Sequence, residues 1–166
     1  FGTIIFAACL IGWNRLFSKE IILRKLGEGK LRDSLNEVEE KNKEITDSIN
    51  YAKRIQYALL ASDSILKRNL NEHFVLFKPK DIVSGDFYWM SEKADHIIFT
   101  AVDCTGHGVP GAFMSMLGVS FLNKIVNESG FVEPSKILNS LRENIIYALK
   151  QEGAIDEAKD GMDISL

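Results

Sequence analysis

Two aspartates occupy positions where an acidic side chain needs a compensating partner. Asp86 follows a glycine in the segment SGDFYW, at the start of a predicted strand. Asp103 ends the apolar run 97–102 and begins the segment DCTGHG. An unpaired charge at the point where a buried strand emerges is costly or shifts its pKa. A divalent cation would compensate both carboxylates, and oxygen ligands select hard ions such as magnesium or manganese.

The loop after Asp103 could contribute to the same site through its backbone. Gly106 and Gly108 permit unusual backbone angles, so the carbonyl of Cys104 could also face a metal. A helix predicted to begin near Pro110 would direct its N-terminal amides toward this loop, which favours an anion such as phosphate. Taken singly, these features are also typical of ordinary turns, because Asp side chains readily bond nearby backbone amides. His107 is interpreted as a brace of the loop, with a proton-donor role as the alternative.

The elements around these residues predict an α+β domain. Short strands are expected at 73–77, 86–90 and 97–102, and the last, as an unbroken apolar run, is expected to be buried on both faces. Two helices follow, one from near Pro110 through Val126 and one from near Pro134. The second helix carries an apolar stripe at Ile137, Leu141, Ile145 and Leu149. Asp163 lies in a further strand-like segment, 162–166, and is not assigned to the site.

The N-terminal segment predicts a membrane helix. Residues 1–13 carry no charge, but a spanning helix needs about 20 apolar residues, so we expect only part of such a helix within 1–17. A basic flank marks the cytoplasmic side, which predicts an inner-membrane protein whose part after this flank lies in the cytoplasm. A buried core helix or a signal peptide is the alternative. The six basic residues of this flank, against Glu20 and Glu28, are Arg15, Lys19, Arg24, Lys25, Lys30 and Arg32.

The stretch 31–59 has the alternating spacing of three and four residues that is typical of a coiled coil. Asn42 falls in the seam of this pattern, where it can fix register and favour a parallel homodimer. The alternative is a single amphipathic helix that lies on its own domain. The predicted seam positions are Leu31, Leu35, Val38, Asn42, Ile45, Ile49, Ala52, Gln56 and Leu59.

Composition excludes other classes of protein. Of 166 residues, 46% are hydrophobic and 26% charged, which predicts a folded globular part. The net charge of -3 argues against a nucleic-acid binder. The two cysteines, Cys9 and Cys104, lie far apart in dissimilar surroundings, so a disulfide framework is not expected. The chain begins within an apolar run and ends inside a strand-like segment, which indicates an excerpt of a longer protein.

Together, the segments KPKDIVSGDFYW at 78–89 and DCTGHGVPGAFMSMLG from Asp103 resemble one known family. They are similar to the SpoIIE-like branch of the metal-dependent (PPM, protein phosphatase 2C-like) Ser/Thr protein phosphatases. The resemblance covers 74–166 and implies part of a β-sandwich flanked by helices. It also implies two Mn2+ or Mg2+ ions, with Asp86 on one, Asp103 bridging both and the Cys104 carbonyl completing the local set. The water they activate would attack a phosphomonoester without a covalent enzyme intermediate.

These expectations divide the chain into four parts. They are a partial transmembrane helix at 1–17, a juxtamembrane and coiled-coil signalling helix at 18–62, a linker at 63–72 and the N-terminal half of a phosphatase domain at 73–166. The expected substrate is a phosphoprotein such as an anti-sigma-factor antagonist, with regulation through the coiled coil. The excerpt itself is expected to be poorly active, because further metal ligands would come from the missing half. The alternative is a non-catalytic, membrane-anchored scaffold with a phosphatase-like binding domain.

Overall fold

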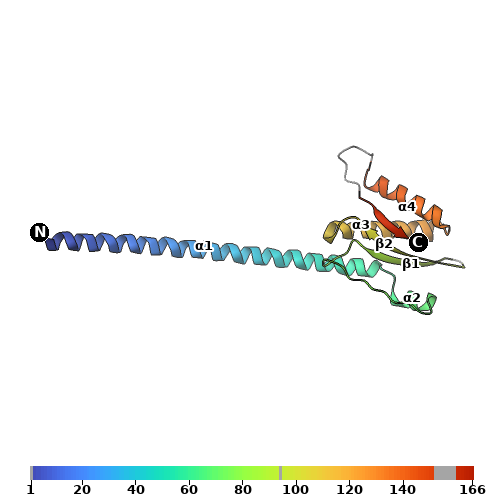
Figure 1. Ribbon diagram of the computed structural model, residues 1–166, viewed down its shortest axis with the longest axis horizontal. Helices are drawn as coiled ribbons and strands as arrows, with labels where there is room; N and C mark the ends of the chain where they lie inside the picture. Colours follow the sequence, from blue (N-terminus) through green and yellow to red (C-terminus); the bar gives the residue numbers. More distant parts are fainter. Residues whose placement is uncertain (1, 94, 152–159) are drawn as a thin grey trace. The chain divides into compact units, whose positions relative to one another are not determined.

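The computed structural model describes residues 2–93, 95–151 and 160–166, without the side chains of 3–11 and 16. The chain divides into two compact units, Phe1–Asp47 and Ser48–Leu166. Figure 1 shows the elements in order along the chain. Each unit is described below by itself.

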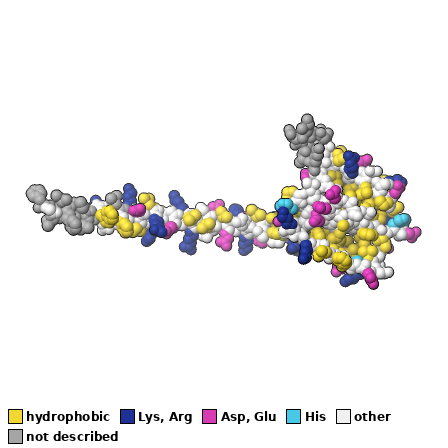
Figure 2. All heavy atoms as spheres, viewed as in Figure 1, with side chains coloured by type: hydrophobic (Ala, Val, Ile, Leu, Met, Phe, Trp, Pro, Cys, Tyr) yellow, Lys and Arg dark blue, Asp and Glu magenta, His cyan; other side chains and the backbone are white. Residues whose placement is uncertain are grey.

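The first unit is helical throughout its described part. It belongs to helix α1, Gly2–Leu59, which continues into the second unit. Apolar residues at the predicted seam are exposed to solvent, including Leu35 at 60% and Val38 at 56%. Figure 2 shows hydrophobic side chains interspersed with charged ones along the described part of the helix. The helix expected here is confirmed, and the coiled coil stays a prediction. The membrane helix also stays a prediction, because most side chains of 1–17 that carry it lie outside the described residues.

The second unit contains the remaining helices and one sheet. In chain order, its elements after α1 are α2 Asp63–Asn69, β1 Phe87–Lys93, β2 His96–Cys104, α3 Gly108–Leu122, the π-helix η1 Asn123–Glu128, α4 Pro134–Ala148 and β3 Met162–Ser165. The three strands form an antiparallel sheet in the order β1-β2-β3. The α+β class expected from the sequence is confirmed as a combination of helices with a small antiparallel sheet.

The core lies between one face of the sheet and the helices α3, η1 and α4. Leu122, Val126 and Ile137 are fully buried there against strand residues such as Trp89 and Val102. The indole Nε1 of Trp89 donates a hydrogen bond to Asn123 Oδ1 at 3.0 Å, which ties β1 to the start of η1. The helical segment Gly108–Glu128 is the one described stretch long and apolar enough to span a membrane, but half of it is buried in this core. We interpret it as a core helix.

The expectation that the strand at 97–102 is buried on both faces is wrong. Along β2 burial alternates, with Ile98 and Val102 buried while Ile97 and Phe99 are 44% and 59% exposed. The physical reason is that α3, η1 and α4 cover one face of β2, whereas on the other face α2 packs against Met90 of β1 and leaves Ile97 and Phe99 exposed. An unbroken apolar run does not reveal which of its two faces has a partner.

The strand expected at 73–77 is also absent. These residues are irregular, with Phe74 89% exposed and Leu76 75% exposed. A strand needs a neighbour to pair with, and the ladders of the described sheet join only β1, β2 and β3. The strand expected at 86–90 is present, although it begins at Phe87 and continues to Lys93. The two later helices begin at Gly108 and Pro134, close to the expected starts.

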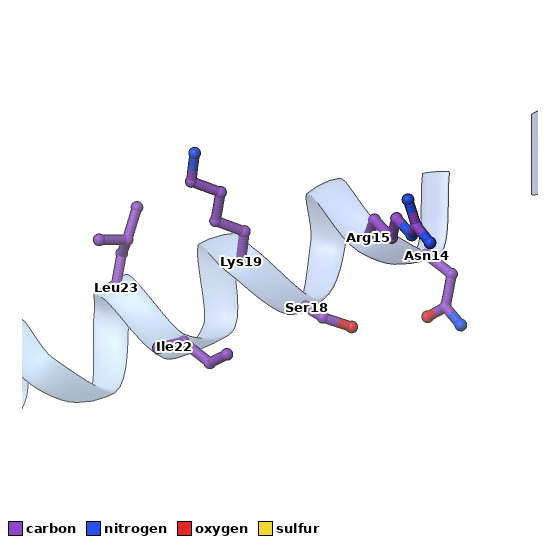
Figure 3. A pocket seen from close by; sticks show the side chains of 6 residues that line it. All are labelled: Asn14, Arg15, Ser18, Lys19, Ile22 and Leu23. Atoms are coloured by element: carbon purple, nitrogen blue, oxygen red, sulfur yellow. The ribbon is translucent and has the colours of Figure 1, made fainter. Parts of the chain in front are cut away.

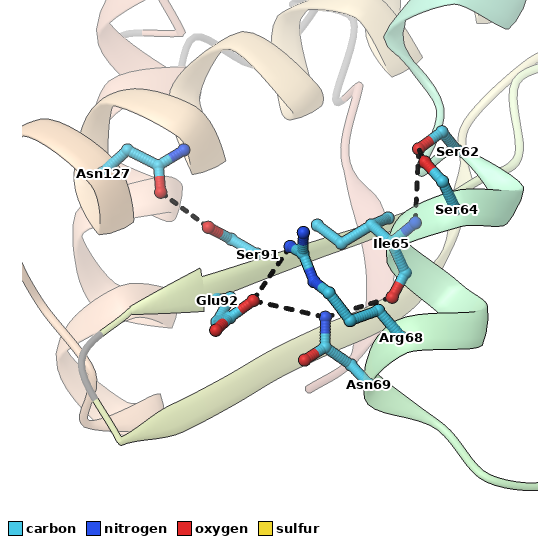
Figure 4. A network of polar contacts seen from close by, with 8 residues as sticks. All are labelled: Ser62, Ser64, Ile65, Arg68, Asn69, Ser91, Glu92 and Asn127. Atoms are coloured by element: carbon cyan, nitrogen blue, oxygen red, sulfur yellow. Dashed lines mark hydrogen bonds and ion pairs between the residues drawn. The ribbon is translucent and has the colours of Figure 1, made fainter.

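The segment expected to be a linker, 63–72, contains helix α2. Its N-cap is Ser62, whose Oγ accepts a hydrogen bond from the backbone N–H of Ile65. Figure 4 shows how the end of α2 is attached to β1, with Arg68 Nη2 at 2.9 Å from Glu92 Oε2. On the preceding residue of the strand, Ser91 Oγ donates to Asn127 Oδ1 at 2.6 Å. Strand β1 is thus fixed to a helix from each side, which holds the strand that follows Asp86.

Candidate functional site

The two predicted acidic residues come together at one end of the β1–β2 hairpin. The strand register pairs Phe87 with Val102, so the preceding Asp86 lies opposite Asp103. Residues directly opposite one another in an antiparallel pair point to the same face of the sheet. The carboxyl groups of Asp86 and Asp103 are close enough for a hydrogen bond between them. The β1–β2 hairpin therefore brings together two residues that lie apart in the sequence.

The electrostatics of this pair are unfavourable without a counter-charge. The pKa of Asp86 is raised above its ordinary value, first by partial loss of solvent and then by the negative charge of Asp103 and the hydrogen bond with it. Both residues are exposed in the described structure, so the loss of solvent is modest. Like charges at short distance disfavour ionisation of both groups. A cation placed between the carboxylates would remove this repulsion, so the pair fits a divalent metal.

Glycines bring the backbone of the two motifs into direct contact. A Cβ atom on Gly85 would lie 2.7 Å from the carbonyl oxygen of Gly106 and 3.3 Å from that of Cys104. A Cβ atom on Gly111 would lie 2.7 Å from the same Gly106 oxygen. Gly106 itself has a φ of +85°, which other residues rarely adopt. The approach of the Asp86 segment, the loop and the start of α3 therefore depends on these positions having no side chain.

The placement of Cys104 suits its expected contribution by a carbonyl. Its side chain is buried at 4% exposure, and burial, followed by the charges of Asp86 and Asp103, raises the pKa of the thiol to about 12. A protonated, buried thiol is a poor metal ligand. The Cys104 carbonyl oxygen instead lies beside Gly85, next to the acidic pair. Its role as a ligand stays a prediction.

His107 is attached to the segment that leads into the site. Its Nδ1 lies 2.8 Å from Asp81 Oδ2, and both side chains are exposed. A Cβ atom on Gly108 would be 3.5 Å from the same Asp81 oxygen, so loop and segment are in close contact here too. His107 also precedes the first residue of α3. These contacts agree with the interpretation of His107 as a brace, and nothing in them tests a proton-donor role.

Asp163 is a site neighbour that the sequence did not assign. The β2–β3 register pairs Asp103 directly with Asp163. Asp86, Asp103 and Asp163 all line a cavity of about 1100 Å3 along the exposed face of the sheet, bounded also by 72–78. Among the described residues, however, no group of three His, Cys, Asp or Glu side chains is arranged to hold a metal ion. The described site therefore offers two carboxylates and a carbonyl, which is part of a coordination shell.

A second hollow lies on α1 and has a different character. Figure 3 shows its side chains, among them Arg15, Lys19, Ile22 and Leu23, projecting from a single helix. One helix cannot surround a small molecule, so we assign no chemistry to this surface. Its basic residues belong to the flank that predicts the cytoplasmic side of a membrane.

Comparison with known proteins shows a similarity to a solved structure. No family model and no curated protein matches the sequence. The chain is similar to a solved structure described as the SiaA-PP2C domain of Pseudomonas aeruginosa, with 39% sequence identity and a TM-score of 0.63. The match covers 74% of this chain and 48% of that chain, so it spans about half of the solved domain structure. The described helices and small sheet are consistent with part of a PP2C-type, phosphatase-like domain.

Proposed function

We propose that this chain is part of a metal-dependent Ser/Thr protein phosphatase of the PPM type, on its SpoIIE-like branch. The observation that carries the proposal is the pairing of Asp86 with Asp103 across the hairpin, beside a glycine loop that leads into helix α3. The similarity to a PP2C domain supports it. A structural sheet has no use for an acidic residue whose pKa is raised by a neighbouring carboxylate, as that of Asp86 is by Asp103.

The residues of this chain would hold the metal and present it to the substrate. Asp86 and Asp103 would bind Mn2+ or Mg2+ through their carboxylates, and Cys104 through its carbonyl. When bound, two such ions would activate a water and stabilise the negative charge of the phosphoryl group. The free backbone amides at the N-terminal end of α3 favour the binding of a phosphate oxygen. The glycine contacts hold these groups in one place, so that they need not reorganise during the reaction.

The proposed substrates are phosphoproteins of bacterial signalling, such as an anti-sigma-factor antagonist. The proposed setting is the inner membrane, with the phosphatase part in the cytoplasm and a homodimer formed through the coiled coil. The exposed apolar residues on α1, such as Leu35 and Val38, support a partner helix, because a row of such side chains is stabilised by covering it. Rearrangement of the paired helices would regulate the site.

Insertion of one residue next to Ile49 tests the proposed regulation. One extra residue rotates the upstream helix by about 100° relative to the downstream part. We expect the full-length protein to keep metal binding but to lose its response to the upstream signal. A variant with unchanged activity and unchanged response would contradict regulation through helix rotation.

The central experiment is a phosphatase assay on the full-length protein with a phosphoserine protein substrate. We expect turnover that requires Mn2+ or Mg2+ and that Asp103→Asn abolishes, because this residue lies between Asp86 and Asp163 in the row of acids. We expect residues 1–166 alone to be poorly active, since they supply only part of a coordination shell. A folded full-length protein that binds phosphoprotein without metal-dependent turnover would instead support the scaffold alternative.

A further inference from the structure

Helix α1 carries a second exposed stripe on the side away from the predicted seam. Its positions recur every three or four residues, so they stay within an arc of about 100° around the helix. The N-terminal half of the stripe combines cations with apolar side chains, of which Ile22 and Leu26 are 57% and 59% exposed. Figure 3 shows part of this surface, where Lys19 and Leu23 project to the same side. The members of this basic half are Arg15, Lys19, Ile22, Leu26 and Lys30.

The same stripe changes sign further along the helix. Beyond the basic half, the next five positions at this spacing are all acidic and exposed, and they are Asp33, Glu37, Glu40, Glu44 and Asp47. The whole helix follows this change. Six basic and two acidic residues give 15–32 a net charge of +4, whereas two basic and six acidic residues give 33–47 a net charge of -4. A partner that fits the stripe is therefore anionic beside the basic half and does not extend along the acidic half.

The cations of the basic half form no ion pair with the described residues of the protein. The ion pair found within 15–32 joins Arg24 to Glu28 at 3.0 Å, and neither residue lies on the stripe. Exposed cations interspersed with apolar side chains are typical of helices that contact an anionic lipid surface. There the cations meet phosphate groups, and the apolar side chains reach the boundary with the acyl chains.

A bilayer surface fits this change of sign better than other anionic partners. The uncharged run 1–13 precedes Arg15 closely, so the proposed membrane segment would place the basic half beside the headgroups. Arg15 and Lys30 are about 22 Å apart along the helix axis, whereas the negative potential of the surface fades within a Debye length of about 8 Å. A helix that leans with this side toward the bilayer, as tilted membrane helices do, keeps the basic half within reach and leaves the acidic half outside. A nucleic acid would instead require cations along the whole stripe.

We propose that the basic half of this stripe binds the headgroups of anionic phospholipids where α1 leaves the membrane. The acidic half is repelled by the same surface and holds the rest of the helix away from it. The inference rests on the proposed membrane setting. Its consequence is that the direction in which α1 leaves the membrane depends on the content of anionic lipid and on ionic strength. The predicted seam lies on the other side of the helix, so lipid contact does not cover it.

The test compares how two spin-labelled lipids associate with the full-length protein in phosphatidylcholine vesicles. The motionally restricted part of the electron paramagnetic resonance spectrum reports the lipids in contact with the protein. At low salt we expect phosphatidylglycerol to associate more strongly than phosphatidylcholine, by roughly 2- to 5-fold. Salt at about 1 M, where the Debye length is about 3 Å, should remove this preference. Arg15→Gln with Lys19→Gln should also reduce it toward equal association, whereas Lys41→Gln with Lys43→Gln removes the same charge from the acidic region and should leave it unchanged.

A further variant tests the acidic half. Asp33→Lys with Glu37→Lys should raise the preference for phosphatidylglycerol above that of wild type, because the repulsive part of the stripe then begins further from the membrane. All substituted side chains are exposed, and glutamine and lysine are good helix formers, so the helix should be retained. Equal association of both lipids with wild type, or an equal loss of preference in the control variant, would overturn the proposal. If wild type shows no preference and the first variant changes the oligomeric state in light scattering, the stripe is instead an interface between copies of this chain.

The proposed function and this inference fail in different ways, because lipid association is measured without metal or turnover. If alkaline carbonate releases the full-length protein from membranes, the proposed membrane setting is wrong. Stronger sedimentation with phosphatidylglycerol vesicles than with phosphatidylcholine vesicles would then still support the basic half as a lipid-binding surface, and equal sedimentation would refute it. If the protein resists carbonate but has no preference between the two lipids, the membrane setting stands and only this inference is refuted.

Discussion

Replacing Gly85 by alanine would separate the two motifs that the structure brings into contact. The backbone φ at Gly85 is not in the left-handed region, so an alanine meets no conformational strain there. The obstacle is space, because the new Cβ would lie 2.7 Å from the Gly106 carbonyl oxygen, where ordinary contacts begin at 3.4 Å. The Cβ is bonded directly to the backbone and the oxygen belongs to it, so neither atom can swing aside as the end of a long side chain can. The loop must therefore move by about 0.7 Å, the difference between these two distances.

Two consequences follow, and their magnitudes differ. Forcing an extra methyl group into a packed site costs about 1–3 kcal/mol of unfolding free energy. Restricting the unfolded chain returns about 0.4–1 kcal/mol of this, as expected for glycine to alanine changes. We therefore expect a net loss of about 1–2 kcal/mol. The displacement matters more for function, because a misplacement of about 1 Å in a catalytic group can lower the rate by about 100-fold.

The assay combines urea unfolding with Mn2+ titration of the full-length protein. Gly118→Ala is the control for stability alone, since its Cβ would meet the ring of Phe87 at 2.7 Å, within the packing of α3 on β1. It should lose stability while its Mn2+ affinity stays near that of wild type. Gly161→Ala has nothing within 4 Å of the new Cβ and should change neither quantity. If Gly85→Ala matches wild type in both measurements, the backbone contact does not set the position of Asp86.

Three further substitutions test other parts of the structure. Asp86→Asn should stabilise the metal-free protein at neutral pH, because folding raises the pKa of Asp86, and by at most about 1 kcal/mol, because the group is exposed. The gain in the free energy of unfolding, measured with urea, should vanish below the ordinary pKa of an aspartate. A gain that persists there would contradict this cause. Ile137→Ala, at a position with 0% exposure, should cost about 2–5 kcal/mol in the same assay; a loss below 1 kcal/mol would mean that α4 is not part of the core. Leu35→Glu should convert a dimer to a monomer in light scattering, and a wild-type monomer would refute the coiled coil.

The sequence by itself determined the features that local chemistry encodes. The helices near Pro110 and Pro134, the continuous helix through 31–59 and the strands beside Asp86 and Asp103 follow from periodicity and turn residues, which act over a few neighbouring residues. The two acidic motifs were found in the same way, because a glycine before one aspartate and a glycine loop after the other are local signals. Their metal role remains a prediction, drawn from residue type and resemblance.

The tertiary structure decided everything that depends on a partner distant in the chain. Strand register placed Asp86 opposite Asp103 and brought Asp163 beside it, and a register is set by pairing, which no single segment encodes. The segment 73–77 has strand-forming residues but no described neighbour to pair with, so it is irregular. Gln56 fits a seam facing another helix, yet its hydrogen bonds are made within its own domain. Periodicity shows that a side chain lies on a particular stripe of a helix, and only the fold decides what covers that stripe.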